Sequence, residues 1–279
     1  MDKQTVADFK KWFHAYVQSY ASDDPERQRN FDLKERHTFR VCMEIVRLGR
    51  ALGLGGDEQR LAEVIALFHD IGRFQQYARF GTFLDGRSLN HAELGVAILR
   101  EKAVLGNLDA ASRDLILYAI AHHNKAVLPP CEDECALFFS RLLRDADKLD
   151  IWRVVTDYYR RRAKGERNQA IELDLPDTPD ISPEVCQALM SREIVQAANI
   201  KTLNDFKLLQ VGWVYDLNFA PAVGRLVEKG YLNMIRAALP DSPAVREIFV
   251  AVDAYLDQGL PGHLRERRPQ SRLQPTSPA

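Results

Sequence analysis

The stretch IALFHDIGRF, residues 65–74, begins as an apolar helix and then changes character. Its first four residues are apolar, and His69 and Asp70 follow them directly. An imidazole and a carboxylate are costly to bury unless a partner satisfies them. The stretch therefore predicts a buried helix that ends at a ligand or a polar partner.

The segments around this stretch carry the helical period. In residues 37–54, Val41, Ile45, Leu48 and Leu52 fall on one stripe. Residues 57–70, 90–105, 109–125 and 134–163 repeat the pattern, as do several segments after residue 183. No run of alternating polar and apolar residues of strand length is present in the sequence. These patterns predict an all-α fold, a helical bundle with a C-terminal helical extension.

Interruptions of this period predict the domain organisation. Residues 72–89 hold three glycines and three phenylalanines and are expected to form a long irregular connection. We predict a first domain at 1–165 with a core at about 30–155, and a linker at 166–183. A helical region at 184–261 would either pack on that core or serve as an interaction element, and we favour packing because it is rich in apolar residues. A disordered tail would follow at 262–279.

Composition sets the broad class of the protein. Of 279 residues, 46% are hydrophobic and 28% are charged, as in an ordinary globular protein, and the net charge is −1. A charge near zero disfavours long nucleic acid as a partner. The sequence shows no apolar run suited to a signal peptide or a membrane span, so we expect a cytoplasmic protein without a membrane partner. Cys131 and Cys135 could begin a zinc site, but no second pair completes it.

Histidines near predicted helix ends are the main chemical signal. Five of the seven lie there, and carboxylates accompany them at Asp70 and in the segment RDADKLD, residues 144–150. Imidazole nitrogen and carboxylate oxygen are ligands for zinc, iron, manganese, cobalt and nickel. Each residue taken singly is more often a hydrogen-bonded core residue than a ligand. Together they exceed the needs of one tetrahedral ion and suit two ions that share a carboxylate; the five are His37, His69, His91, His122 and His123.

The order of these residues resembles a known signature. His37, the pair at residues 69–70 and Asp147 resemble the H…HD…D pattern of the HD-domain superfamily of metal-dependent phosphohydrolases. The further histidines look like the additional ligands of its dinuclear branch, which includes the HD-GYP cyclic-dinucleotide phosphodiesterases and the diiron HD oxygenases. The resemblance covers about residues 30–155. The chain reads HDIGR where many of these phosphodiesterases read HDIGK, and it has no GYP motif, which argues against the cyclic-di-GMP subclass.

The resemblance implies a ligand set. By position, His37, His69, Asp70 and Asp147 would hold one divalent ion. Asp70 would bridge to a second ion, whose remaining ligands would be the three later histidines, His91, His122 and His123. The metals that this ligand set suits are Fe, Mn, Co, Ni, Mg and Zn.

Phosphate chemistry also requires positive charge and a cover over the substrate. Arg73, Lys125 and Lys148 each lie within three residues of an implied ligand and are candidates to bind phosphate oxygens beside the catalytic Asp70. The alternative for each cation is a solvated side chain or a surface ion pair. Aromatic residues of the 72–89 segment would cover the pocket or anchor the segment to the core, and we favour anchoring for at least two of them; they are Phe74, Tyr77, Phe80 and Phe83.

Three functions are compatible with these residues. The leading hypothesis is a metal-dependent phosphohydrolase, a phosphomonoesterase or phosphodiesterase, that acts on a nucleotide or another small phosphate ester. The second is a diiron oxygenase of the HD type, and the third is a regulatory module that binds metal without catalysis. The substrate, the native metal and the oligomeric state, including a homo-oligomer, stay open.

Overall fold

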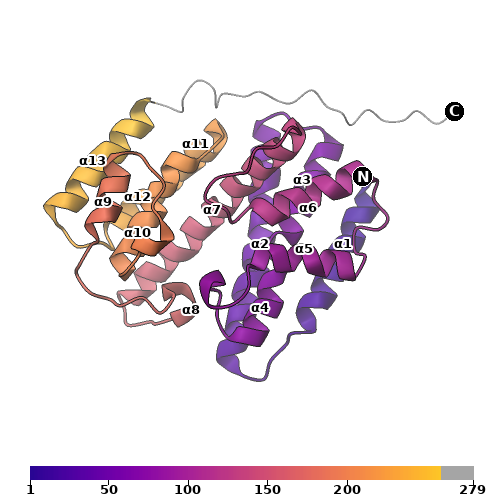
Figure 1. The fold of residues 1–279 in the computed structure, drawn as a ribbon, viewed down its shortest axis with the longest axis horizontal. Coiled ribbons are helices and arrows are strands. Elements are labelled where there is room, and N and C mark those ends of the chain that lie inside the picture. The colour runs from indigo at the N-terminus through magenta and orange to yellow at the C-terminus, as the bar shows by residue number, and fades with distance from the viewer. Residues whose placement is uncertain (259–279) are drawn as a thin grey trace.

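The computed structural model describes residues 1–258, and these contain α-helices and short 3-10 helices but no strand (Figure 1). The all-α prediction is therefore confirmed. The predicted tail at 262–279 lies outside the described residues. The longer helices of the N-terminal part are α1 (Lys3–Gln18), α2 (Pro25–Ala51), α3 (Gly56–Phe68), α4 (Gly72–Phe80), α5 (His91–Glu101), α6 (Ala110–His122) and α7 (Glu134–Arg162).

Helices α2, α3, α6 and α7 form the centre of the bundle, where α2 packs along both α3 and α7. Local sequence explains where α2 begins: Pro25 occupies its first turn, and the Asp24 carboxylate accepts a hydrogen bond from the backbone N–H of Glu26 at 2.8 Å. The apolar stripe predicted for this helix faces the core, since Val41, Ile45 and Leu48 are fully buried. This packing places the C-terminal end of α3 against the middle of α2 and α7.

Residues 72–89 are not the irregular connection that the sequence predicted. Residues Gly72–Phe80 form α4, which ends at Gly81 in the left-handed conformation, and Asp85–Arg87 form the 3-10 helix η1. The segment is helical because Phe74 and Tyr77, one turn apart, both insert into the core. Phe83 is also buried, whereas Phe80 is 41% exposed. Three of the four aromatic residues therefore anchor the segment.

The C-terminal region packs along α7, opposite the N-terminal helices (Figure 1). Its helices are α9 (Pro183–Met190), α10 (Leu203–Gly212), α11 (Ala220–Lys229), α12 (Tyr231–Arg236) and α13 (Pro243–Gln258), with 3-10 helices η2 (Ala197–Asn199) and η3 (Trp213–Asp216). Helix α10 is tied to α7 by Gln210, whose carbonyl accepts from the Trp152 indole and whose side chain accepts from the Tyr159 hydroxyl, both at 2.9 Å.

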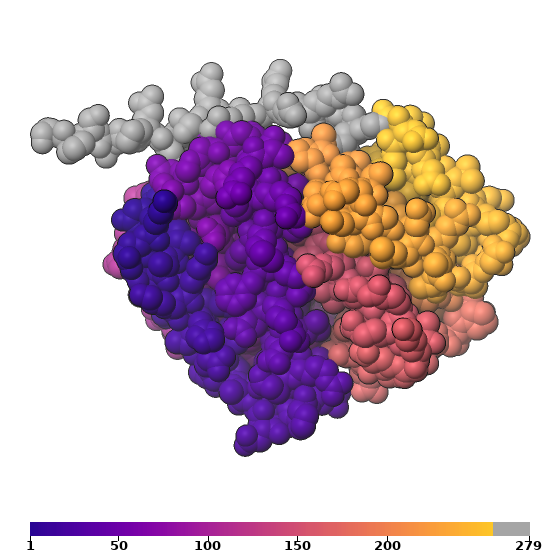
Figure 2. Space-filling view, turned by 180° about the vertical axis from the view of Figure 1, so that it is seen from behind, coloured from indigo at the N-terminus to yellow at the C-terminus, as the bar shows by residue number. Residues whose placement is uncertain are grey.

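The C-terminal region also reaches α2. Arg225 on α11 pairs with Glu44 on α2 at 2.8 Å, and the two surfaces adjoin in the view from behind (Figure 2). The segment before this region contains the short helix α8 (Gln169–Glu172), whose buried Glu172 accepts hydrogen bonds from Tyr158 and Arg162 of α7. The boundaries drawn from the sequence between domain, linker and extension stay a prediction.

Among the helices of residues 1–258, none combines the length and the apolar character that crossing a lipid bilayer requires.

Candidate metal centre

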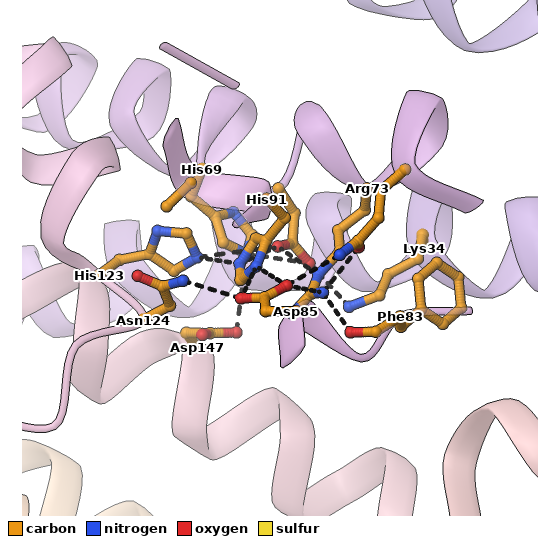
Figure 3. Close-up of polar contacts among 12 residues, drawn as sticks. Lys34, His69, Arg73, Phe83, Asp85, His91, His123, Asn124 and Asp147 are labelled. Atoms are coloured by element: carbon orange, nitrogen blue, oxygen red, sulfur yellow. Dashed lines mark hydrogen bonds and ion pairs between the residues drawn. The ribbon is translucent and has the colours of Figure 1, made fainter. Parts of the chain in front are cut away.

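Six of the predicted ligands meet between the helices of the bundle, and most of them lie at helix ends. His69 caps the C-terminus of α3 and Asp70 follows it, His123 caps the C-terminus of α6, and His91 opens α5. His37 and Asp147 come from within α2 and α7. The side chains of His69, His91, His123 and Asp147 converge in Figure 3. Residues far apart in the chain thus form one buried cluster.

Three groups within this cluster bring their nitrogen and oxygen atoms within 4.8 Å of one another. They share members, so the cluster is continuous rather than three separate sites. The groups are His37, His69 and Asp70; His69, His123 and Asp147; and Asp70, His91 and His123.

Asp70 divides its two oxygens between the two ends of the cluster. Oδ2 lies 3.6 Å from His37 Nε2 and 3.7 Å from His69 Nε2. Oδ1 lies 3.3 Å from His91 Nε2 and 3.7 Å from His123 Nε2. One carboxylate therefore faces two pairs of histidines, as a carboxylate shared by two cations would.

The four histidines that surround Asp70 through Nε2 are held in place by hydrogen bonds of the second ring nitrogen, Nδ1. His69 Nδ1 and His123 Nδ1 each donate at 2.7 Å to the carbonyl three residues earlier, that of Ala66 and of Ile120. These carbonyls belong to the last turns of α3 and α6, which have no partner within the helix. His37 and His91 instead direct Nδ1 to carboxylates. Hydrogen bonds of this kind are typical of metal-ligating histidines, because they fix the ring and leave Nε2 for the metal.

The carboxylate partners of His37 and His91 are Asp150 and Asp85. His37 Nδ1 lies 2.7 Å from Asp150, which Arg40 also contacts at 2.6 Å. His91 Nδ1 lies 2.8 Å from Asp85. Each end of the cluster thus has its own supporting carboxylate.

Several buried atoms in the cluster lack a partner. His37 Nε2 and Asp147 Oδ1 lie 3.1 Å apart, and neither they nor His69 Nε2 make a hydrogen bond of good geometry, although all three atoms are buried. His91 Nε2 and His123 Nε2 lie 3.0 Å apart, although both rings direct Nδ1 to an acceptor. Burial, together with the Arg73 charge, lowers the pKa of His91 to about 3, so its ring is neutral and presents a lone pair. A cation would satisfy all of these atoms, and the ligand set fits divalent Mn, Fe, Co, Ni or Zn.

Charge at the other end of the cluster leads to the same conclusion. Burial opposes protonation of His37, but the carboxylates of Asp147, 3.1 Å from Nε2, and Asp150, 2.7 Å from Nδ1, outweigh it and raise the pKa of His37 to about 9. Two carboxylates therefore stabilise a positive charge at this ring. A divalent ion that replaces the proton on His37 would supply this positive charge.

His122 does not join the cluster. Its ring lies against Tyr118 with centroids 4.3 Å apart, and its Nδ1 is 2.9 Å from the Tyr118 carbonyl. Consecutive residues of an α-helix point about 100° apart, so only one member of the HH pair can face the metal centre. The ligand role that the sequence assigned to His122 therefore has no support in this geometry, and His123 is the member that converges.

The predicted cations differ in their surroundings. Arg73 donates through Nη1 to Asp85 at 2.9 Å and to the Phe83 carbonyl. Its main role in this geometry is therefore to hold Asp85 in place. Lys148 pairs with Asp216 at 2.8 Å. Lys125 lines the cavity beside the metal centre. All three border that cavity, but Arg73 and Lys148 are already engaged.

Lys34 was not among the predicted cations, although within residues 1–258 it makes the shortest cation contact to Asp70. Its Nζ donates to Asp70 Oδ2 at 2.8 Å and lies 5.3 Å from the centre of the Phe83 ring. The signal available in the sequence was its spacing, since residues three apart share a face of a helix and Lys34 precedes His37 by three. Asp85 was not predicted either, because it lies within residues 72–89, which were expected to be irregular.

Asp85 allows the two ends of the cluster to be tested separately. Asp85→Asn is expected to weaken one of two bound ions by roughly 10–100-fold, because it removes the carboxylate that orients His91. Asp150→Asn should weaken the other ion, through His37. A metal titration of each purified variant, monitored by calorimetry, measures the affinity for each ion. If both variants weaken the same ion, the assignment of one supporting carboxylate to each end is wrong.

Comparison with known proteins is consistent with this geometry. Residues 35–152 match the family model described as HD domain. The matched range contains all six residues of the cluster. No curated protein and no solved structure matches the chain.

Proposed function

Residues 35–152 of this chain form an HD domain, the domain of a superfamily of metal-dependent phosphohydrolases, and from this premise we propose that the protein hydrolyses a small phosphate ester. The observation that carries the proposal is the position of Asp70, with one oxygen toward each pair of histidines. A carboxylate shared in this way suits two divalent ions, which is the arrangement that clamps a phosphate group. We also propose that six residues hold these ions: His37, His69, Asp70, His91, His123 and Asp147.

When bound, two divalent ions would supply a hydroxide nucleophile at neutral pH and stabilise negative charge on the phosphate oxygens. The residues of the chain prepare the site for this chemistry. Asp85 and Asp150 hold the rings of His91 and His37 with Nε2 toward the centre. Arg73 restrains Asp85, so the ligand positions are set before substrate arrives.

Lys34 and Lys125 are the cations with a role toward substrate. Lys34 lies on the Asp70 side of the cavity with 19% of its side chain exposed, and Lys125 lies on the His123 side. Their ammonium groups would neutralise phosphate oxygens that the ions do not contact. Lys34 now donates to Asp70, and we expect this hydrogen bond to be exchanged for one to the substrate phosphate.

The cavity beside the cluster has a volume of about 380 Å³. This is near the lower end of the range for small-molecule sites, which is about 300–1,000 Å³. It supports a compact ester as the substrate and disfavours long nucleic acid, as does the net charge of −1.

The test is elemental analysis of protein purified without a metal-binding tag, followed by phosphate release from a panel of small esters. We expect about two ions per chain, and hydrolysis with manganese, cobalt or nickel that ceases on chelation and returns with metal. Iron accompanied by oxygen uptake, without phosphate release, would replace the proposal by the diiron oxygenase. Protein that takes up no metal even after reconstitution would leave a non-catalytic regulatory module.

A further inference from the structure

The side chains that line the cavity beside the metal centre fall into two groups. One group contains the cluster and the cations Lys34, Arg73 and Lys125. The other group, which we call the apolar end, comes from α7 and from the C-terminal region, and all but Ile151 lie outside the matched range 35–152; its apolar members are Ile151, Ile194, Val195, Leu209 and Trp213.

Four separate segments build the apolar end. Ile151 lies on α7, Ile194 and Val195 lie between α9 and η2, and Leu209 lies on α10. Trp213 opens η3, is only partly buried, and is backed by Trp152 with ring centroids 6.0 Å apart. An indole that is supported on one side and borders a cavity on the other presents a large apolar surface to a ligand. This surface belongs to the cavity that also contains Asp70.

The charged groups near the apolar end pair with one another, with two cations on one carboxylate. Asp216 accepts from Lys148 at 2.8 Å and also pairs with the buried Arg144. Arg144 in turn donates to the carbonyls of His123 and Ala126, both at 3.2 Å. These groups tie η3 to the loop after α6, and their hydrogen bonds are used within the protein. Arg144, Lys148 and Asp216 are thus engaged with one another, and Gln196 is a further polar side chain in this part of the lining.

We infer that the C-terminal region builds a subsite for the apolar organic group of the substrate, an inference that rests on the proposed phosphohydrolase function. The phosphate lies at the metal end, and a compact aryl or branched alkyl group lies against Trp213 and Leu209. A monoester, which carries one organic group, is the substrate class that this single apolar surface suits. Sugar phosphates and glycerol phosphate fit this subsite poorly.

The first test compares hydrolysis of 1-naphthyl phosphate with that of glycerol phosphate by the metal-loaded full chain. We expect kcat/KM to favour the naphthyl ester by about 100-fold, because its rings are removed from water at the apolar end. Trp213→Ala should raise KM for the naphthyl ester by roughly ten-fold or more, a larger change than its effect on KM for glycerol phosphate. Equal or better turnover of glycerol phosphate by the native protein would overturn the inference.

Two further variants guard against a trivial result. Ile194→Ala removes apolar surface from a different segment of the same end and should raise KM for the naphthyl ester alone. Met190→Ala is the matched control, because Met190 lies in the same region, is 49% exposed and does not border the cavity. It should behave as the native protein. A Met190→Ala effect equal to that of Trp213→Ala would show a general disturbance of the region and count against the subsite.

Binding separates this inference from the proposed function. Calorimetry with 1-naphthylphosphonate and methylphosphonate, which cannot be hydrolysed, measures the subsite whether or not any ester turns over. Stronger binding of the naphthyl compound that depends on Trp213, with no hydrolysis of any ester, would overturn the phosphohydrolase and keep the apolar subsite. Equal binding of the two phosphonates would overturn the subsite even if esters are hydrolysed.

Discussion

Asp70→Ala is expected to remove both metal ions and to abolish phosphate release. The two oxygens of Asp70 face opposite ends of the cluster, Oδ2 toward His37 and His69 and Oδ1 toward His91 and His123. Without this carboxylate, each end of the cluster loses an anionic ligand. The negative charge that would attract a divalent ion is then smaller at both ends. Elemental analysis of the variant and the native protein, purified side by side, measures the loss.

Folding of the Asp70→Ala protein must be measured separately, because Lys34 loses its partner in this variant. Circular dichroism and thermal unfolding of the metal-free proteins provide this comparison. Asp114→Ala is the matched control, since Asp114 is an exposed carboxylate on α6 outside the cluster. It should retain both metal and activity. A folded Asp70→Ala protein that still binds two ions would contradict the shared carboxylate.

Gly72→Ala is expected to lower the free energy of unfolding by more than about 3 kcal/mol. A Cβ atom at this position would lie 2.2 Å from the His91 carbonyl oxygen and 2.8 Å from the Gly95 nitrogen. Both are backbone atoms of α5, so no side-chain rotation can relieve the clash and the two helices must separate. For a chain of this size the loss corresponds to a fall in Tm of roughly 6–12 °C.

The same separation should reach the metal centre. Asp70 precedes Gly72 by two residues, and His91 is the residue whose carbonyl the new methyl group would strike. Moving α4 from α5 therefore lengthens the 3.3 Å approach of Asp70 Oδ1 to His91 Nε2. Metal titration of the Gly72→Ala protein below its Tm should show one ion weakened more than the other.

Gly224→Ala is the control for this substitution. Gly224 lies within α11, and a Cβ there would meet nothing within 4 Å. Alanine is a better helix former than glycine, so we expect stability to be equal or slightly higher. Thermal unfolding of both variants under the same conditions gives the comparison. If Gly72→Ala unfolds with the native Tm, the close approach of α4 and α5 is not a constraint on the fold.

The all-α fold and the HD domain follow from local properties of the sequence, and both predictions are confirmed. Helical period and the order of the histidines and aspartates are written along the chain, so no tertiary information is needed to recognise them. The error at residues 72–89 has the same origin. The three glycines in this segment predict a loop, but Gly72 is required by a close contact with α5, which a local pattern does not reveal.

Which residues join the site depends on the directions in which their side chains point, and these are set by helix packing. The HH pair offered two candidates, and only the packing of α6 turned His123 toward Asp70 and His122 toward Tyr118. Asp85 and Lys34 joined the site because α4, η1 and α2 bring them there, over distances in sequence that no motif spans.

The apolar end of the cavity is even less predictable from the sequence than the metal centre. Its residues come from α7, the segment before η2, α10 and η3, and none of them carries a chemical signature of its own. Residue type and spacing report which side chains can bind metal, since that chemistry resides in single groups. The shape and polarity of a cavity arise only when separate helices pack, because they are properties of surfaces that the chain creates on folding.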